Sequence, residues 1–272
     1  MIKKNYLENL NNSKKPFIIY KSNKGFDLYT DFSKKIILTK NNIEKFINQS
    51  TKLKSKKKET DLFIGFFGYE ILNNLIGIKV KKQKGLKFPK GVFYKPETKK
   101  KLPNKLNYKN LGIVRSNKLF KINIDKSSYK VVFDKFKKKI KSGETYQIKI
   151  CTKYSNKAQI DALDFFCRLV KSNMAPEAFI IKDRDYSIIS CSPENLINKK
   201  NDFITTKPIA GTLKKTKKLN KIKALAFFKK NIKETKEHNM IVDMERSDLS
   251  RICKAGSVKI LKKKIVEEYK DL

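Results

Sequence analysis

The stretch that decides the fold is EHNMIVDMERSDLSRICKAGSVKI, residues 237–260. The first part of this stretch belongs to a longer region, residues 219–251, whose pattern is mostly helical. The last four residues of the stretch, 257–260, form a short apolar run that predicts a strand. Charged side chains recur at spacings of three and five along the predicted helix, which favours structural ion pairs over chemistry. These residues are Asp243, Arg246, Asp248 and Arg251.

Three further segments stand out earlier in the chain. GETYQ occupies residues 143–147, SPE residues 192–194 and PIAGT residues 208–212. Each segment alone is a weak signal, because short motifs of this kind occur by chance in many proteins. Their order along one chain, followed by residues 237–260, is specific.

Together these segments resemble the chorismate-utilising enzymes, especially component I of anthranilate synthase and of 4-amino-4-deoxychorismate synthase. Residues 237–260 look like the signature E-H/N-x-M-[IL]-V-D-x-x-R-N-D-L of that family, with Ser247 where asparagine is usual. FIGFFGYE, residues 63–70, is similar to a glycine-rich and aromatic segment of the family's N-terminal region. The resemblance covers nearly the whole chain and is densest after residue 127.

The resemblance implies a catalytic site for chorismate, a dianion whose ring hydroxyl leaves only when an acid protonates it. Glu194 matches the family's general acid, a role that requires a raised pKa from partial burial or a neighbouring carboxylate. Glu237 matches a glutamate that holds Mg²⁺, a hard cation that suits carboxylate ligands. The backbone and hydroxyl donors of the PIAGT segment are expected to bind a substrate carboxylate, through Ala210, Gly211 and Thr212.

Gln147 separates the branches of the family. The members that add water, isochorismate and salicylate synthases, place a lysine base at this position, and glutamine cannot take a proton. The resemblance therefore implies ammonia as the nucleophile, supplied by a glutamine amidotransferase subunit. An ordinary polar position on a strand is the alternative interpretation of Gln147.

The product is left open between two amines. Ala210 favours anthranilate, because many aminodeoxychorismate synthases carry a nucleophilic lysine at this position. The absence of a recognisable tryptophan-binding segment near residues 17–22 favours 4-amino-4-deoxychorismate, to which we lean. A second departure is Glu177, which stands where the family has an aromatic residue.

The expected fold is α+β, with antiparallel sheets flanked by helices as in anthranilate synthase component I. Strands joined by turns are expected before residue 40, and hairpins are expected at 178–190 and 196–206. Helices are expected at 41–50, at 127–142 with Ser127 or Ser128 as its cap, and at 161–172. Residues 145–155 alternate as a half-buried strand does, and the lysine-rich stretch at 95–109 indicates a loop. We assign residues 1–110 to the N-terminal region and residues 111–272 to the first part of the chorismate-binding domain.

The composition limits the chemistry and the partners. The chain has 272 residues, with 65 Lys and Arg against 26 Asp and Glu, a formal charge of +39. The lysines are spread along the chain, few residues are arginine, and aromatics do not alternate with lysines on any one strand, which argues against a nucleic-acid partner. Steeply salt-dependent binding to nucleic acid is the competing hypothesis from another class.

The chain contains a single histidine, His238, which excludes a histidine-rich zinc site and a catalytic triad built on any other histidine. The four cysteines form no CxxC pair, and no signal peptide or membrane span is apparent, so a reducing, cytoplasmic location is expected.

The chain stops at Leu272, whereas family members continue and carry further metal and substrate ligands there. We therefore expect residues 1–272 alone to be inactive and to expose apolar surface. A non-catalytic remnant that binds a partner is the third hypothesis.

Overall fold

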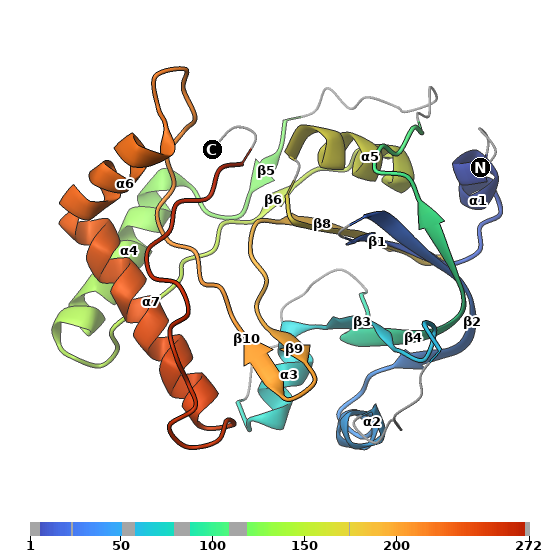
Figure 1. The fold of residues 1–272 in the computed structure, drawn as a ribbon, viewed down its shortest axis with the longest axis horizontal. Helices are drawn as coiled ribbons and strands as arrows, with labels where there is room; N and C mark the ends of the chain where they lie inside the picture. The colour runs from blue at the N-terminus through green and yellow to red at the C-terminus, as the bar shows by residue number, and fades with distance from the viewer. Residues whose placement is uncertain are drawn as a thin grey trace. The chain divides into compact units, whose positions relative to one another are not determined.

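The computed structural model describes residues 6–22, 24–50, 58–78, 88–108, 119–173 and 175–269. Contacts divide the chain into two compact units (Figure 1). Unit 1 comprises residues 1–109 and 162–272, and unit 2 comprises residues 110–161. The division predicted from the sequence, at residue 110, stays a prediction.

Unit 1 is built on an antiparallel six-stranded sheet in the order β3-β4-β2-β1-β7-β8. The strands are β1 (Phe17–Ser22), β2 (Gly25–Ile37), β3 (Ile64–Phe67), β4 (Gly91–Leu102), β7 (Glu177–Lys182) and β8 (Ser187–Ser192). The first strands were predicted from short apolar runs, and the β7–β8 hairpin from its two runs about a polar turn; both predictions are confirmed. The predicted α+β class with an antiparallel sheet is likewise confirmed.

The long pair β2 and β4 carries the curvature of the sheet. Its register shifts between Phe32 and Lys34, where Pro96 lies opposite Phe32. An irregularity of this kind bends a strand and increases its twist, and a proline is tolerated there because no ladder hydrogen bond is lost. Figure 1 shows β2 bending along its length.

The loop predicted at 95–109 is wrong over its first half, because β4 continues to Leu102. The lysines there stand on a sheet face and not in a solvated loop. Asp27 of β2 is nearly buried and forms ion pairs with Lys99 at 3.4 Å and with Lys101. The long apolar stems of lysine let it cover a sheet while the charge reaches a partner.

Apolar side chains cover both faces of this sheet. On one face the strands pack against α5 (Ala162–Asn173) and α1 (Tyr6–Asn12), with Phe17, Leu28 and Phe166 at the centre. On the other face Ile18, Val92, Tyr94 and Ile181 form a second cluster. A third cluster joins α2 (Ile43–Ser50) and α3 (Tyr69–Leu75) through Ile43 and Ile71. The helices predicted at 41–50 and 161–172 are therefore confirmed.

The rest of unit 1 follows β8. A hairpin of β9 (Asn198–Lys200) and β10 (Phe203–Thr205) turns through Asn201, whose φ of 53° suits asparagine. Helix α6 (Lys221–Lys230) and helix α7 (Ile232–Ser250) then run consecutively, so the helical prediction for 219–251 is confirmed. Residues 257–260 are not a strand; they belong to an irregular segment that follows α7.

Unit 2 contains α4 (Lys126–Lys141) and a two-stranded pair of β5 (Lys121–Ile122) and β6 (Tyr154–Ser155). The helix is as predicted, but its cap is not a serine. Asp125 is the N-cap, and its carboxylate accepts a hydrogen bond from the Ser128 amide at 2.7 Å. The amides of the first helical turn have no partner within the helix, and a side-chain oxygen at the N-cap supplies one. Gly143 follows the helix with φ of 76°, as a helix-ending glycine does.

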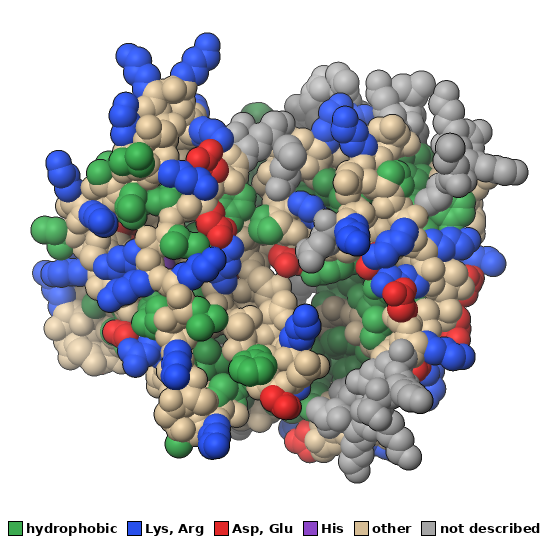
Figure 2. All heavy atoms as spheres, viewed as in Figure 1, with side chains coloured by type: hydrophobic (Ala, Val, Ile, Leu, Met, Phe, Trp, Pro, Cys, Tyr) green, Lys and Arg blue, Asp and Glu red, His purple; other side chains and the backbone are tan. Residues whose placement is uncertain are grey.

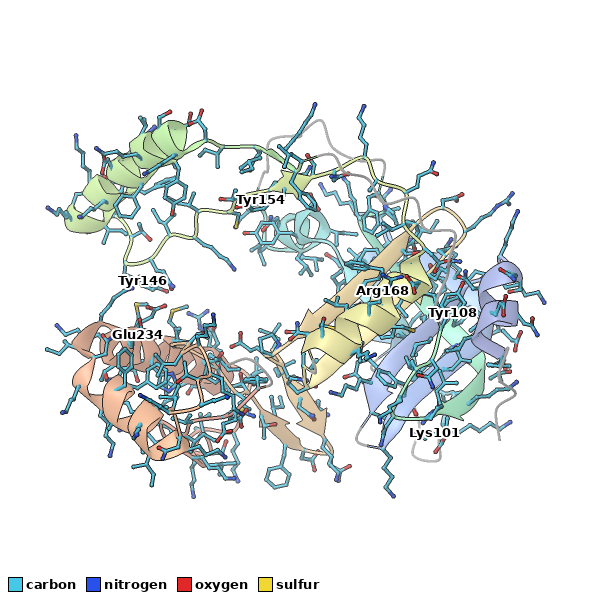
Figure 3. All side chains as sticks on the ribbon, turned by 90° about the horizontal axis from the view of Figure 1, so that it is seen from above. Lys101, Tyr108, Tyr146, Tyr154, Arg168 and Glu234 are labelled. Carbon is cyan, nitrogen blue, oxygen red and sulfur yellow. The ribbon has the colours of Figure 1, made fainter. Side chains whose placement is uncertain are left out.

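The predicted strand at 145–155 is wrong except for Tyr154 and Ser155. In the described part of unit 2, residues 145–153 pair with no strand, and no residue of α4 is buried. Tyr146 and Tyr154 are 64% and 63% exposed (Figure 3). Aromatic side chains are thus exposed in this unit.

Lysine side chains are scattered over the visible face in Figure 2 and do not gather in one patch. None of the helices in the described part of the chain is both long and apolar enough to span a bilayer. All four cysteines are free thiols.

Candidate functional site

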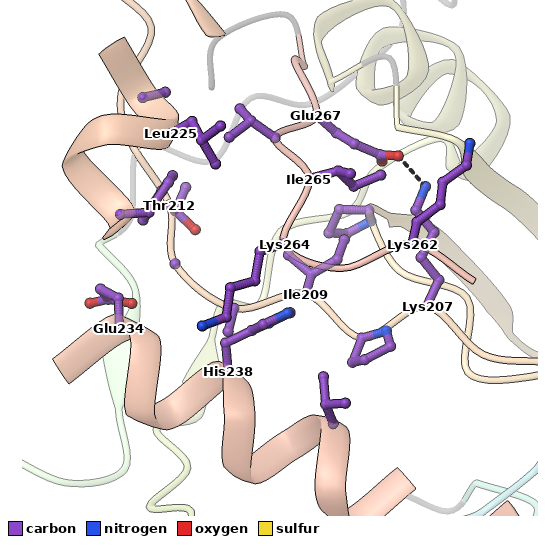
Figure 4. Close-up of a pocket in the computed structure, with 18 of the residues that line it drawn as sticks. Lys207, Ile209, Thr212, Leu225, Glu234, His238, Lys262, Lys264, Ile265 and Glu267 are labelled. Atoms are coloured by element: carbon purple, nitrogen blue, oxygen red, sulfur yellow. Dashed lines mark ion pairs between the residues drawn. The ribbon is translucent and has the colours of Figure 1, made fainter. Parts of the chain in front are cut away.

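A cavity of about 740 Å³ lies in the C-terminal part of unit 1 (Figure 4). Its walls are the end of β10, the segment 206–213, helices α6 and α7, and the irregular segment 258–269. The volume lies in the range of pockets that take small organic ligands. Ala210, Gly211 and Thr212, predicted to bind substrate, all line it.

Gly211 lets the PIAGT segment approach the two helices. Its φ is 77°, and a Cβ at this position would lie 2.6 Å from the Phe228 ring of α6 and 3.2 Å from Oε2 of Glu234 on α7. A side chain here would therefore meet both a conformational and a steric penalty. The close approach brings the backbone of this segment to the cavity wall beside a carboxylate.

Glu194 lies in the turn that follows β8. The Ser192 hydroxyl donates to the Glu194 carbonyl at 2.8 Å, and the Glu194 amide donates back to Ser192 Oγ at 3.2 Å. Oε1 of Glu194 accepts a hydrogen bond from the Ile209 amide at 3.0 Å. The structure thus joins the SPE and PIAGT segments directly, at the residue before Ala210.

The Glu194 side chain is exposed. It does not line the cavity, although the preceding Pro193 does. A general acid needs burial, or a neighbouring negative charge, to keep its proton at neutral pH. Glu194 is not buried in this structure.

Helix α7 presents the predicted metal ligand. Its N-cap is Asn231, whose side chain accepts from the Glu234 amide at 3.2 Å. Glu237 is half-buried, and Glu234 lies one turn before it on the same face. Glu234 lines the cavity, whereas Glu237 is outside its lining.

Glu234 was missed from the sequence, although its spacing of three from Glu237 was a usable signal. No three His, Cys, Asp or Glu side chains converge as a metal site within the described ranges. Mg²⁺ binds through one or two carboxylates together with water and substrate oxygens. Glu234 and Glu237 fit such a partial ligand set.

The cavity wall is strongly cationic. Eight Lys and Arg residues line it against four glutamates, a net excess of four positive charges. Two glutamates are paired, Glu267 with Lys207 at 2.5 Å and Glu268 with Lys215 at 2.9 Å. Glu245 accepts a hydrogen bond from the Thr206 hydroxyl at 2.6 Å. Such a wall attracts anionic ligands.

His238, on α7, also lines the cavity (Figure 4). Its Nδ1 is buried and has no hydrogen-bond partner within the described part of the chain. The signature residues further along α7 behave partly as predicted, because Arg246 pairs with Asp243 at 3.5 Å.

Gln147 belongs to unit 2 and is exposed. Its carbonyl accepts a hydrogen bond from the Thr145 hydroxyl at 3.2 Å, in a segment without regular secondary structure. Its role in the reaction stays a prediction, as do the roles of the other site residues.

The comparisons with known proteins concern the family and the fold of the chain. The family described as chorismate binding enzyme matches residues 4–272. Aminodeoxychorismate synthase component 1 of Bacillus subtilis is 34% identical over 137 residues, which are 50% of this chain and 29% of that protein. Anthranilate synthase component 1 of Arthrobacter globiformis is 34% identical over 147 residues, 52% of this chain and 28% of that protein.

Among solved structures, anthranilate synthase component I from Streptococcus pneumoniae TIGR4 has the same fold, with a TM-score of 0.60 at 20% identity. The similarity covers 86% of this chain and 59% of that one. The matched stretch spans less than a third of each curated relative described above. The chain belongs to the family of chorismate binding enzymes.

Proposed function

We propose that these residues are part of component I of an amine-adding chorismate enzyme. The reaction replaces the ring hydroxyl of chorismate by ammonia, which a glutamine amidotransferase subunit supplies. The observation that carries the proposal is the hydrogen bond from the Ile209 amide to Glu194, because it places a carboxyl group beside a cationic cavity lined by Ala210, Gly211 and Thr212.

Glu194 is proposed as the acid that protonates the leaving hydroxyl, which departs as water. An acid must hold its proton until the C–O bond breaks, so Glu194 needs a less exposed environment when substrate is bound. A bound dianion with a closed cavity supplies that change, since both the ligand's charge and the loss of water favour the protonated carboxyl. The cations of the cavity wall hold the substrate carboxylates.

Mg²⁺ is proposed to bind at Glu237, with Glu234 as the second carboxylate of the same helix face. When bound, Mg²⁺ would supply positive charge that orients and neutralises a substrate carboxylate. The side chains of this chain contribute only part of its coordination, and the remaining ligands come from substrate, water or further polypeptide.

Gln147 supports ammonia as the nucleophile, because a glutamine cannot activate water by removing its proton. The favoured product is 4-amino-4-deoxychorismate, which belongs to folate biosynthesis through para-aminobenzoate. Ala210 supports the alternative, anthranilate, which belongs to tryptophan biosynthesis. We place the reaction in the cytoplasm, in keeping with the four free thiols.

The test uses the complete native protein that contains these residues, with chorismate, ammonium and Mg²⁺, and identifies the product by chromatography and mass spectrometry. We expect 4-amino-4-deoxychorismate and no isochorismate. If the product is anthranilate, the protein is an anthranilate synthase component. If the product is isochorismate, the proposal that the enzyme adds an amine is wrong. We further expect residues 1–272 alone to give no turnover; measurable turnover by that fragment would contradict this expectation.

A further inference from the structure

Glu177 is the first residue of β7, and it lies at the end of the sheet from which the Glu194 turn leaves. In the β7–β8 register it stands directly opposite Ser192, the first residue of the SPE segment. Its carboxylate accepts two hydrogen bonds, one on each oxygen. Asn195 Nδ2 donates to Oε1 at 3.1 Å, and the Tyr20 hydroxyl of β1 donates to Oε2.

These bonds reach the residue next to the proposed acid. Asn195 follows Glu194 directly, and it is half-buried whereas Glu194 is exposed. The turn is therefore held on three sides, by Ser192 within it, by Ile209 at the Glu194 carboxylate and by Glu177 at Asn195. The first two tie Glu194 itself, to the end of β8 and to the PIAGT segment, and the third ties the following residue, Asn195, to the first residue of β7.

We propose that Glu177 is a positioning residue that fixes the turn bearing Glu194 through Asn195. This inference rests on the proposed role of Glu194 as the acid. An aromatic side chain at position 177 has no pair of acceptor oxygens, so it could not bind Asn195 and Tyr20 together. Burial and the hydrogen bond to Glu177 raise the pKa of Tyr20, which keeps its hydroxyl protonated as a donor.

Replacing Glu177 by glutamine separates the hydrogen bonds of this side chain from its charge. In E177Q the amide oxygen can still accept from Asn195, and the amide nitrogen can donate to the Tyr20 hydroxyl, which also accepts. E177Q should therefore keep the geometry, whereas E177A and N195A remove the same link. E59A is the matched control, because the Glu59 side chain is 76% exposed and its ion pair, with Lys99 at 3.2 Å, involves neither Asn195 nor Tyr20.

The activity test measures kcat and KM for chorismate in the complete native protein. A displaced acid acts on the chemical step, so we expect kcat to fall about tenfold in E177A and in N195A, with KM changed less than about twofold. The double variant E177A/N195A should lose no more than either single variant, since both break one interaction. E177Q and E59A should match the parent.

A structural readout covers the case in which the parent protein lacks the proposed activity. Residue-resolved hydrogen exchange of the Ile209 amide reports its bond to Glu194, with E194A as the positive control. We expect faster exchange in E177A and N195A, and parental exchange in E177Q and E59A. An inactive parent would refute the proposed function while exchange still decides the positioning role. An active parent whose kcat and Ile209 exchange are unaffected by E177A would overturn the inference and leave the function standing.

Discussion

Replacing Tyr94 by phenylalanine tests the buried polar contact that ties the two ends of the curved sheet together. Tyr94 on β4 is 1% exposed and donates to the carboxylate of Asp183, which follows β7 and is 5% exposed. The Tyr94 and Tyr186 oxygens are 2.7 Å apart, and Lys35 Nζ lies 2.6 Å from Asp183. Y94F removes one hydroxyl and leaves the ring in place.

The expected loss follows from what remains at the carboxylate. A hydrogen bond to a charged group is worth about 1.5–3 kcal/mol. Lys35 and the Arg184 amide still bind Asp183, so the carboxylate does not become unpaired. We therefore expect the free energy of unfolding to fall by about 2 kcal/mol, which for a chain of this size lowers Tm by roughly 4–8 °C.

The pH dependence of the loss is specific. Burial raises the pKa of Asp183, but hydrogen bonds from Lys35 and Tyr94 outweigh burial and lower it below its usual value. A lowered pKa stabilises the fold above the unfolded value of about 3.9, and this stability disappears as the pH falls through the folded pKa. The deficit of Y94F should be complete at neutral pH and shrink below about pH 4.

Denaturant titration at several pH values measures this, with Y69F as the control because Tyr69 is 75% exposed. The reasoning is refuted if Y94F unfolds like Y69F, or if its deficit grows as the pH is lowered.

Three other outcomes follow from the same structure. In the complete protein, E194Q should lower kcat by about 100-fold or more with a small change in KM, as expected for loss of a general acid; steady-state assays check it, and an unchanged kcat would remove Glu194 from the reaction. G65A should destabilise by about 1–3 kcal/mol, because its Cβ would lie 1.9 Å from the Val92 carbonyl oxygen; denaturant titration checks it, and parental stability would contradict the packing of β3 on β4. E237Q should raise the Mg²⁺ concentration that gives half-maximal turnover, and an EDTA-treated enzyme should recover on addition of Mg²⁺; turnover that is insensitive to chelation would refute the metal assignment.

The sequence predicted those elements whose signal is local. The apolar runs that became β1 and β7 are buried on both faces of the sheet, and the apolar stripe of α5 is buried on one face of the helix, so the sequence pattern and the burial agree. Gly65 has a local reason of its own, because β4 passes too close for a side chain at this position.

Elements that depend on distant partners were missed. The lysines of β4 suggested a loop, and only the pairing with Asp27 across β2 explains why they lie on a sheet. The alternation at 145–155 suggested a strand, but a strand requires a neighbour, and among the described residues of this segment only Tyr154 and Ser155 pair with another strand, β5. Ser127 and Ser128 were predicted as the cap of α4, but both lie in its first turn, and the preceding Asp125 is the N-cap because its carboxylate accepts from the Ser128 amide.

For the candidate site, the sequence identified the segments but not their contacts. Glu194 and Ile209 are fifteen residues apart in the chain, and their hydrogen bond depends on how the β9–β10 hairpin returns. Glu234 belongs to no motif. The structure shows that it lines the cavity, one turn before Glu237 on α7. The link from Glu177 to Asn195 likewise needs the register of β7 on β8.

The central claim is that ammonia, and not water, replaces the hydroxyl of chorismate. The most direct test supplies the complete protein with chorismate, Mg²⁺ and ¹⁵N-labelled ammonium in water enriched in ¹⁸O, and measures the mass of the product. We predict a product that carries the nitrogen label and no oxygen label. A product that carries ¹⁸O at the ring and no ¹⁵N would contradict the account.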